Sequence, residues 1–133
     1  MIEFEEVGKI LDELAAELPQ KFYEELNGGI ILLPEAKIDP RSRHNDLYIM
    51  GEYHRGGGLG RYITIYYGSF EHLYGNLSRE DLKRRLNHTL KHEFTHHLES
   101  LAGERGLEKE DDEFMYNYLH RTSGDVRRRK LRR

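Results

Sequence analysis

The chain has 133 residues, of which 37% are hydrophobic and 34% charged, and its mean hydropathy is −0.82. This length favours one domain, and the lack of any apolar run of about 18–20 residues argues against a membrane-spanning helix. The absence of cysteine excludes disulfide scaffolds, thiolate zinc sites and cysteine nucleophiles. Side-chain metal ligands must therefore be carboxylates or some of the eight histidines. The acidic N-terminus lacks the features of a secretory signal, so we expect a cytoplasmic protein without membrane insertion.

Charge is distributed unevenly along the chain. Residues 121–133 contain seven basic residues and one acid, a net charge of +6, so the overall charge of −3 leaves −9 on residues 1–120. We therefore expect one folded domain over residues 1–120 and a basic, flexible tail over residues 121–133. The alternative for the tail is a weak electrostatic contact with nucleic acid, a membrane surface or an acidic partner. No aromatic residue lies among its arginines for base stacking, so nucleic-acid binding is not favoured.

In chain order, the first predicted element is an amphipathic helix over residues 2–18, whose apolar residues recur at helical spacing until Pro19 ends it. A short helical turn is predicted over residues 20–26. Three strands follow, separated by a polar loop at residues 34–46 and a glycine-rich turn at residues 54–60. We expect the strands at residues 30–33, 47–53 and 62–67.

A long helix is predicted to follow Ser78. The Ser78 side chain is a suitable N-cap, and Asp81 stands three residues later, an arrangement close to a capping box. Gly103 favours a C-terminal stop, which gives a helix of about 24 residues. One apolar stripe runs along this helix and predicts the face that packs on the core. Its members are Leu82, Leu86, Leu90, Phe94, Leu98 and Leu101.

The same helix carries the sequence His92-Glu93-Phe94-Thr95-His96, which is the HExxH pattern. Residues four apart lie on one helical face, about 6 Å apart along the axis, so the two imidazoles can bind one ion. Both histidines lie away from the apolar stripe. Glu93 is placed to accept a proton from a metal-bound water and to pass it to a leaving amine. The alternative is a helix with surface histidines and an incidental glutamate.

A catalytic zinc site needs a third protein ligand and an open position for water. Glu99 lies about 10 Å further along the helix than His92, which is too far for a compact site, so a supporting or surface role is expected. His97 points about 100° away from His96 and is not expected to bind the metal. The remaining source is the acidic segment 108–113, at the start of a predicted C-terminal helix. A solvated, acid-rich first turn is the alternative for most of that segment.

Several segments resemble the small zincin-like metallopeptidases of bacteria, a family of minimal HExxH proteins. They are FEEVGKILDELAAELP, GGIILLPE, LYIMGEYHR, RYITIYYGSF and LNHTLKHEFTHHLESLAG followed by LEKEDDEF. The resemblance spans about residues 2–120 and includes the doubled histidine of HEFTHH. It implies an α+β fold of the zincin type, with an N-terminal helix, a long HExxH helix and a C-terminal helix. The implied sheet is short, mostly antiparallel and three- to four-stranded.

The resemblance also implies one Zn²⁺ held by His92, His96 and a downstream aspartate, with Glu93 as the general base. In the family pattern a glycine and an aspartate follow soon after the histidines, whereas here both come later. If the family's aspartate is recognised by an apolar residue three positions after it, it corresponds to Asp111. If it is recognised by a glutamate directly after it, it corresponds to Asp112. We assign Asp111.

Together these features predict a zinc-dependent metallopeptidase that acts on a peptide or protein substrate. One of the strands at residues 47–53 and 62–67 is expected to hold an extended substrate by main-chain pairing. The alternative is a zinc-stabilised binding or regulatory module without turnover, which uses the basic tail to contact its partner.

Overall fold

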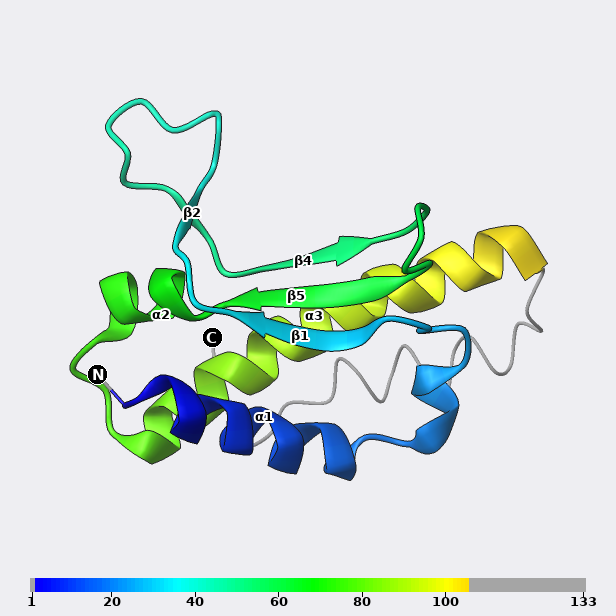
Figure 1. Ribbon diagram of the computed structural model, residues 1–133, viewed down its shortest axis with the longest axis horizontal. Helices are drawn as coiled ribbons and strands as arrows, with labels where there is room; N and C mark the ends of the chain where they lie inside the picture. Colours follow the sequence, from blue (N-terminus) through cyan, green and yellow to red (C-terminus); the bar gives the residue numbers. More distant parts are fainter. Residues whose placement is uncertain (1, 106–133) are drawn as a thin grey trace, which may run out of the picture.

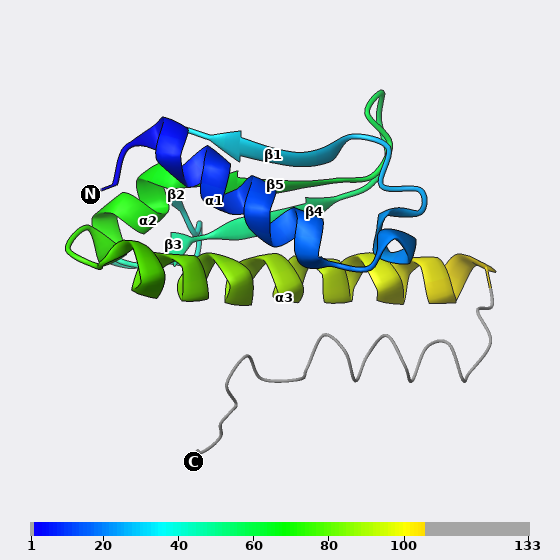
Figure 2. The ribbon, with the colours of Figure 1, turned by 90° about the horizontal axis from the view of Figure 1, so that it is seen from below.

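The computed structural model describes residues 2–105, which form a layer of short strands with helices packed against one face (Figure 1). The helices α1 (Phe4–Glu17) and α3 (Arg79–Arg105) contact each other and cover the same face of the sheet (Figure 2). The predicted C-terminal helix, the acidic segment and the basic tail lie outside the described residues. Within residues 2–105 no helix is long and apolar enough to cross a bilayer. The expected α+β class is confirmed.

The N-terminal helix forms where its apolar periodicity predicts it. In α1 the residues Val7, Ile10, Leu11 and Leu14 are buried, and they recur every three or four positions. The helix ends at Glu17 because the residue before a proline is driven out of the helical region. Leu18 accordingly has an extended backbone, with ψ at 146°. The short turn predicted after it is the 3-10 helix η1 (Gln20–Tyr23).

The main sheet has three strands in the order β1 (Gly29–Leu33), β5 (Tyr62–Tyr66) and β4 (Gly51–His54). β4 runs antiparallel to β5, as a hairpin through the predicted glycine-rich turn, but β1 runs parallel to β5. The main sheet is therefore mixed, with one parallel and one antiparallel pairing, whereas the resemblance implied a mostly antiparallel sheet. Parallel strands need a long connection, and the residues between β1 and β5 provide one.

The strand expected at residues 47–53 is divided between two sheets. The segment expected to be a polar loop contains β2 (Lys37–Ile38), which pairs antiparallel with β3 (Tyr48–Ile49). This small sheet projects from one end of the main sheet (Figure 1). The division falls at Met50, whose carbonyl accepts a hydrogen bond from the backbone N of Tyr66 at 3.0 Å. Beyond Met50 the chain joins the main sheet as β4.

A helix that the sequence analysis did not predict, α2 (Tyr67–Tyr74), begins directly after β5. Its second residue, Gly68, donates a backbone hydrogen bond to the carbonyl of Glu35 at 3.1 Å. A Cβ at Gly68 would lie 2.4 Å from the backbone N of Ala36, which is closer than such atoms can approach. Because glycine has no side chain, position 68 allows α2 to pack against the chain that follows β1.

The long helix α3 begins as predicted, because the Ser78 hydroxyl accepts a hydrogen bond from the backbone N of Asp81 at 3.2 Å. Its apolar stripe forms much of the core, and the first four members are fully buried: Leu82, Leu86, Leu90 and Phe94. The predicted stop at Gly103 is wrong, since α3 continues to Arg105, the last described residue. A glycine ends a helix by adopting a positive φ, and Gly103 does not do so.

Candidate metal centre

A cleft lies between the edge strand β4 and the HExxH face of α3. Residues 51–55 form one wall. The other wall consists of His92, Glu93, His96, Glu99, Ser100 and Gly103. The suggestion that residues 62–67 hold a substrate is wrong, because β5 lies between β1 and β4 and both its edges are paired. The other candidate, 47–53, contributes the edge strand β4, which among the described residues pairs with β5 alone.

His92 and His96 direct their Nε2 atoms at each other across one helical turn. The two atoms are 3.3 Å apart, and the ring planes are nearly perpendicular, at 88°. Two ligands bound to one tetrahedral zinc at about 2.0–2.1 Å are themselves about 3.3–3.4 Å apart. The pair therefore fits the two-histidine part of a zinc site. The same separation also suits a hydrogen bond between one protonated and one unprotonated ring nitrogen.

Glu93 lies beside this pair and is almost fully buried, with 5% of its surface exposed. Among residues 2–105 no group forms a hydrogen bond with its carboxylate. Burial, and secondarily the negative charge of Glu52, raises the pKa of Glu93 to about 7. A carboxyl group with that pKa exchanges a proton readily near neutral pH, which a general base requires. A cation bound by the neighbouring histidines would lower this pKa by electrostatic attraction.

Two further side chains of α3, His97 and Glu99, were not expected to bind the metal. His97 is completely buried and does not line the cleft. Its ring nitrogens contact the Tyr53 hydroxyl and the Glu24 carbonyl, each at 2.9 Å, and burial lowers its pKa. The Glu99 carboxylate is 3.7 Å from Nδ1 of His96, on the side of the ring away from His92. It can therefore orient the His96 imidazole without binding the ion itself.

The predicted third ligand lies outside the part of the chain that the structure describes. Among residues 2–105 no group of three or more histidine, aspartate and glutamate side chains is arranged to hold a metal ion. Asp111 and its alternative Asp112 both lie outside the described residues. The geometry of the histidine pair is therefore compatible with two of the three predicted protein ligands, and the third ligand stays a prediction.

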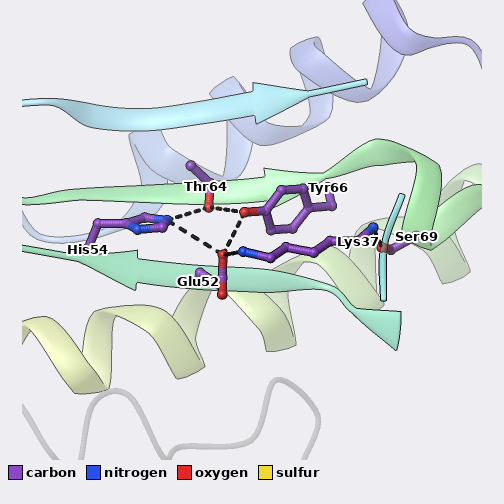
Figure 3. Close-up of polar contacts among 6 residues, drawn as sticks. All are labelled: Lys37, Glu52, His54, Thr64, Tyr66 and Ser69. Carbon is purple, nitrogen blue, oxygen red and sulfur yellow. Dashed lines mark hydrogen bonds and ion pairs between the residues drawn. The ribbon is translucent and has the colours of Figure 1, made fainter. Parts of the chain in front are cut away.

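A polar network on the outer face of the sheet adds a charged group to the cleft. Figure 3 shows Glu52 Oε1 accepting hydrogen bonds from Lys37 Nζ and from the Tyr66 hydroxyl, both at 2.6 Å. Thr64 donates to the Tyr66 oxygen at 3.3 Å and contacts His54 Nε2 at 2.9 Å. Burial opposes ionisation of Glu52, but the two hydrogen bonds outweigh it and lower the pKa of this carboxyl group. Glu52 is thus a fixed negative charge in the cleft wall.

Sequence reasoning did not identify Glu52, Tyr53 or His97 as parts of this arrangement. Glu52 and Tyr53 become cleft residues because β4 pairs with β5 in one register and passes over α3. That placement depends on tertiary packing, which no local pattern encodes. For His97, the doubled histidine was a visible signal, but its buried hydrogen bonds were not predictable from helical angle alone.

A comparison with solved structures finds a relative described as a conserved hypothetical protein from Thermo thermophilus. It is 34% identical, with a TM-score of 0.65, and the match covers 77% of this chain and 99% of that chain. The two proteins belong to one family. The two proteins share the fold over the matched region, and the description of the relative names no activity. No protein-family model and no curated protein matches the chain.

Proposed function

We propose that this protein is a zinc-dependent metallopeptidase whose metal is held by Nε2 of His92 and Nε2 of His96. The observation that carries the proposal is the 3.3 Å separation of these two atoms, which equals the spacing of two ligands on one tetrahedral zinc. The two imidazole rings are nearly perpendicular, with an angle of 88° between their planes. Neutral imidazoles together with a carboxylate are a ligand set that suits zinc. In a chain without cysteine, this is the kind of zinc site that remains available.

Glu93 is the residue that moves protons in this proposal. A zinc ion held by His92 and His96 would supply Lewis-acid chemistry, which acidifies water and polarises a carbonyl group. The Glu93 carboxylate accepts the proton of that water and passes it to the departing amine. Its burial and its lack of a competing hydrogen bond within residues 2–105 keep the carboxylate available for this transfer. Glu99 supports His96 from the opposite side of the ring.

The third protein ligand in this proposal is Asp111, with Asp112 as the alternative. Both follow α3 after a few residues, so the chain has enough length to return to the cleft. A carboxylate there would complete the three-ligand set of a catalytic zinc site and leave one position open for water.

The proposed substrate is an extended peptide that lies along β4. An edge strand offers unpaired N–H and C=O groups, and a peptide can pair with them as an additional strand. β4 forms one wall of the cleft opposite Glu93 and the histidine pair. A peptide paired with β4 would therefore pass the site where water is activated.

The test uses the full-length, zinc-loaded protein and a library of short quenched fluorescent peptides. We expect hydrolysis by the wild type and a loss of at least about 100-fold in Glu93→Gln, because general-base catalysis contributes about 10²–10⁴-fold. Elemental analysis must show the same zinc content in both proteins. Glu80→Gln, an exposed glutamate in the first turn of the same helix, is the matched control and should retain activity.

Each outcome of this experiment has a distinct meaning. Equal hydrolysis by wild type and Glu93→Gln would refute the mechanism. Bound zinc without hydrolysis of any peptide would refute the peptidase and favour the zinc-stabilised binding module. A wild-type protein that binds no zinc would refute both.

A further inference from the structure

His97 has two hydrogen bonds whose directions follow from the chemistry of the partners. The Glu24 carbonyl oxygen can only accept, so His97 Nε2 must carry the proton of the 2.9 Å contact. In the neutral ring Nδ1 then has a lone pair, and the Tyr53 hydroxyl donates to it at 2.9 Å. The completely buried ring is thus held in a single tautomer between two fixed partners. The Tyr53 hydroxyl proton is already donated, so Tyr53 is not placed as an oxyanion donor.

The Tyr53–His97 contact is one of the places where β4 packs against α3. Inward-facing residues alternate along β4, and Gly51 and Tyr53 both face the helix. A Cβ at Gly51 would lie 2.9 Å from Cγ2 of Thr89, so the strand approaches the helix closely there. Thr89 and His97 are eight residues apart, about 12 Å along the helix axis. The HExxH residues lie between these two contacts.

A third contact between the two elements is more exposed. Arg55, just beyond β4, donates a hydrogen bond to the Ser100 hydroxyl at 3.0 Å. An exposed bond of this kind competes with water and contributes little. The hydrogen bond from Tyr53 to His97 is partly buried and ends on a completely buried ring, so it is the stronger of these two polar contacts at the C-terminal side of the HExxH residues.

We propose that Tyr53 and His97 are a positioning pair that holds β4 at a fixed distance over the HExxH face of α3 and so sets the width of the substrate cleft. The proposal rests on the proposed peptidase function for its catalytic consequence, but the structural part is independent of it. Neither residue binds the metal in this account. The pair acts through β4, which is the strand that the peptide would extend.

The first test measures hydrogen–deuterium exchange of backbone amides in the full-length, zinc-loaded protein. Tyr53→Phe removes one hydroxyl and keeps the ring. We expect the amides of β4 to exchange about five-fold faster, the factor that one ordinary buried hydrogen bond supplies, while amides of β1 and α1 are unchanged. Uniformly faster exchange throughout the chain would show a purely global stabilising role and would overturn the proposal, as would unchanged exchange in β4.

The second test separates binding from chemistry with any peptide that the wild type hydrolyses. Tyr53→Phe should raise KM about five-fold and change kcat less than about two-fold, with zinc content unchanged. Loss of zinc, or an effect confined to kcat, would overturn the positioning role. If the wild type hydrolyses no peptide, the proposed function fails, and the exchange experiment alone decides whether the pair fixes β4.

Two variants complete the design. Tyr62→Phe removes a hydroxyl from the adjacent strand, on the residue paired with His54, and should change neither β4 exchange nor KM. His97→Ala removes both hydrogen-bonding groups and should speed the exchange of the β4 amides. His97→Gln retains one donor and one acceptor, so its β4 amides should exchange more slowly than those of His97→Ala. Equal exchange rates of the β4 amides in the His97→Gln and His97→Ala variants would show that the volume of the ring positions β4, and that its hydrogen bonds do not.

Discussion

The buried carboxyl group of Glu93 should destabilise the metal-free protein at neutral pH. Its pKa is raised to about 7 from an ordinary value of 4.5. Below pH 4.5 the group is protonated in the folded and unfolded chain alike and contributes nothing. As the pH rises from 4.5 to about 7, the unfolded chain releases this proton first, so the folded state loses stability. At about 1.36 kcal/mol for each pH unit, the full loss above this range is about 3 kcal/mol.

Replacing Glu93 with glutamine removes this penalty and keeps the side-chain shape. Urea denaturation of metal-free protein should therefore show that the gain in unfolding free energy from Glu93→Gln is about 2–3 kcal/mol larger at about pH 8 than at about pH 5. Glu80→Gln is the control, because that side chain is exposed in the first turn of the same helix and should show no such difference. An equal effect of Glu93→Gln at both pH values would refute the argument that Glu93 is buried without a stabilising partner. Added zinc should reduce the difference, since a nearby cation stabilises the carboxylate.

Three further predictions concern the scaffold and use the same denaturation assay. Leu90→Ala should lower the unfolding free energy by about 2–5 kcal/mol, because the side chain is fully buried in the core; a loss below about 1 kcal/mol would contradict that packing. Gly68→Ala should cost about 1–3 kcal/mol, since its Cβ would meet the backbone of Ala36, and an unchanged midpoint would contradict the close approach. Ser78→Ala should cost about 1 kcal/mol through loss of the N-cap bond to Asp81, whereas Ser78→Asp should retain most of the stability.

Helices were predictable where a single face of the helix is buried. The apolar residues of α1 and of α3 repeat at the period of the helix, and Ser78 marks the start of α3. The strand β5 was predictable from its alternation, because Ile63 and Ile65 face the helices and Thr64 faces the other side, although Thr64 and Tyr66 are buried as well. In each case the local pattern and the tertiary environment favour the same structure.

The remaining elements depend on contacts between distant parts of the chain. β2 and β3 have two residues each, and nothing in so short a segment distinguishes strand from loop. α2 begins within the aromatic sequence that predicted a strand, because Gly68 allows a close approach to residues 35–36. The parallel pairing of β1 with β5 is a topological choice that strand patterns do not encode.

The candidate site likewise contains residues that local sequence predicts and residues that depend on tertiary packing. His92, Glu93 and His96 were predictable because their geometry depends only on the helix that carries them. The cleft wall formed by β4, the fixed charge of Glu52 and the Tyr53–His97 contact depend on how the sheet lies against that helix. Their roles follow only from the packed structure.

Anomalous X-ray diffraction at the zinc edge, from crystals of the zinc-loaded full-length protein, tests the central claim most directly. The account predicts one zinc peak about 2.0–2.1 Å from Nε2 of His92 and from Nε2 of His96, with Asp111 or Asp112 as the third protein ligand. A structure in which the two Nε2 atoms remain hydrogen-bonded to each other, with no zinc peak between them, would contradict it.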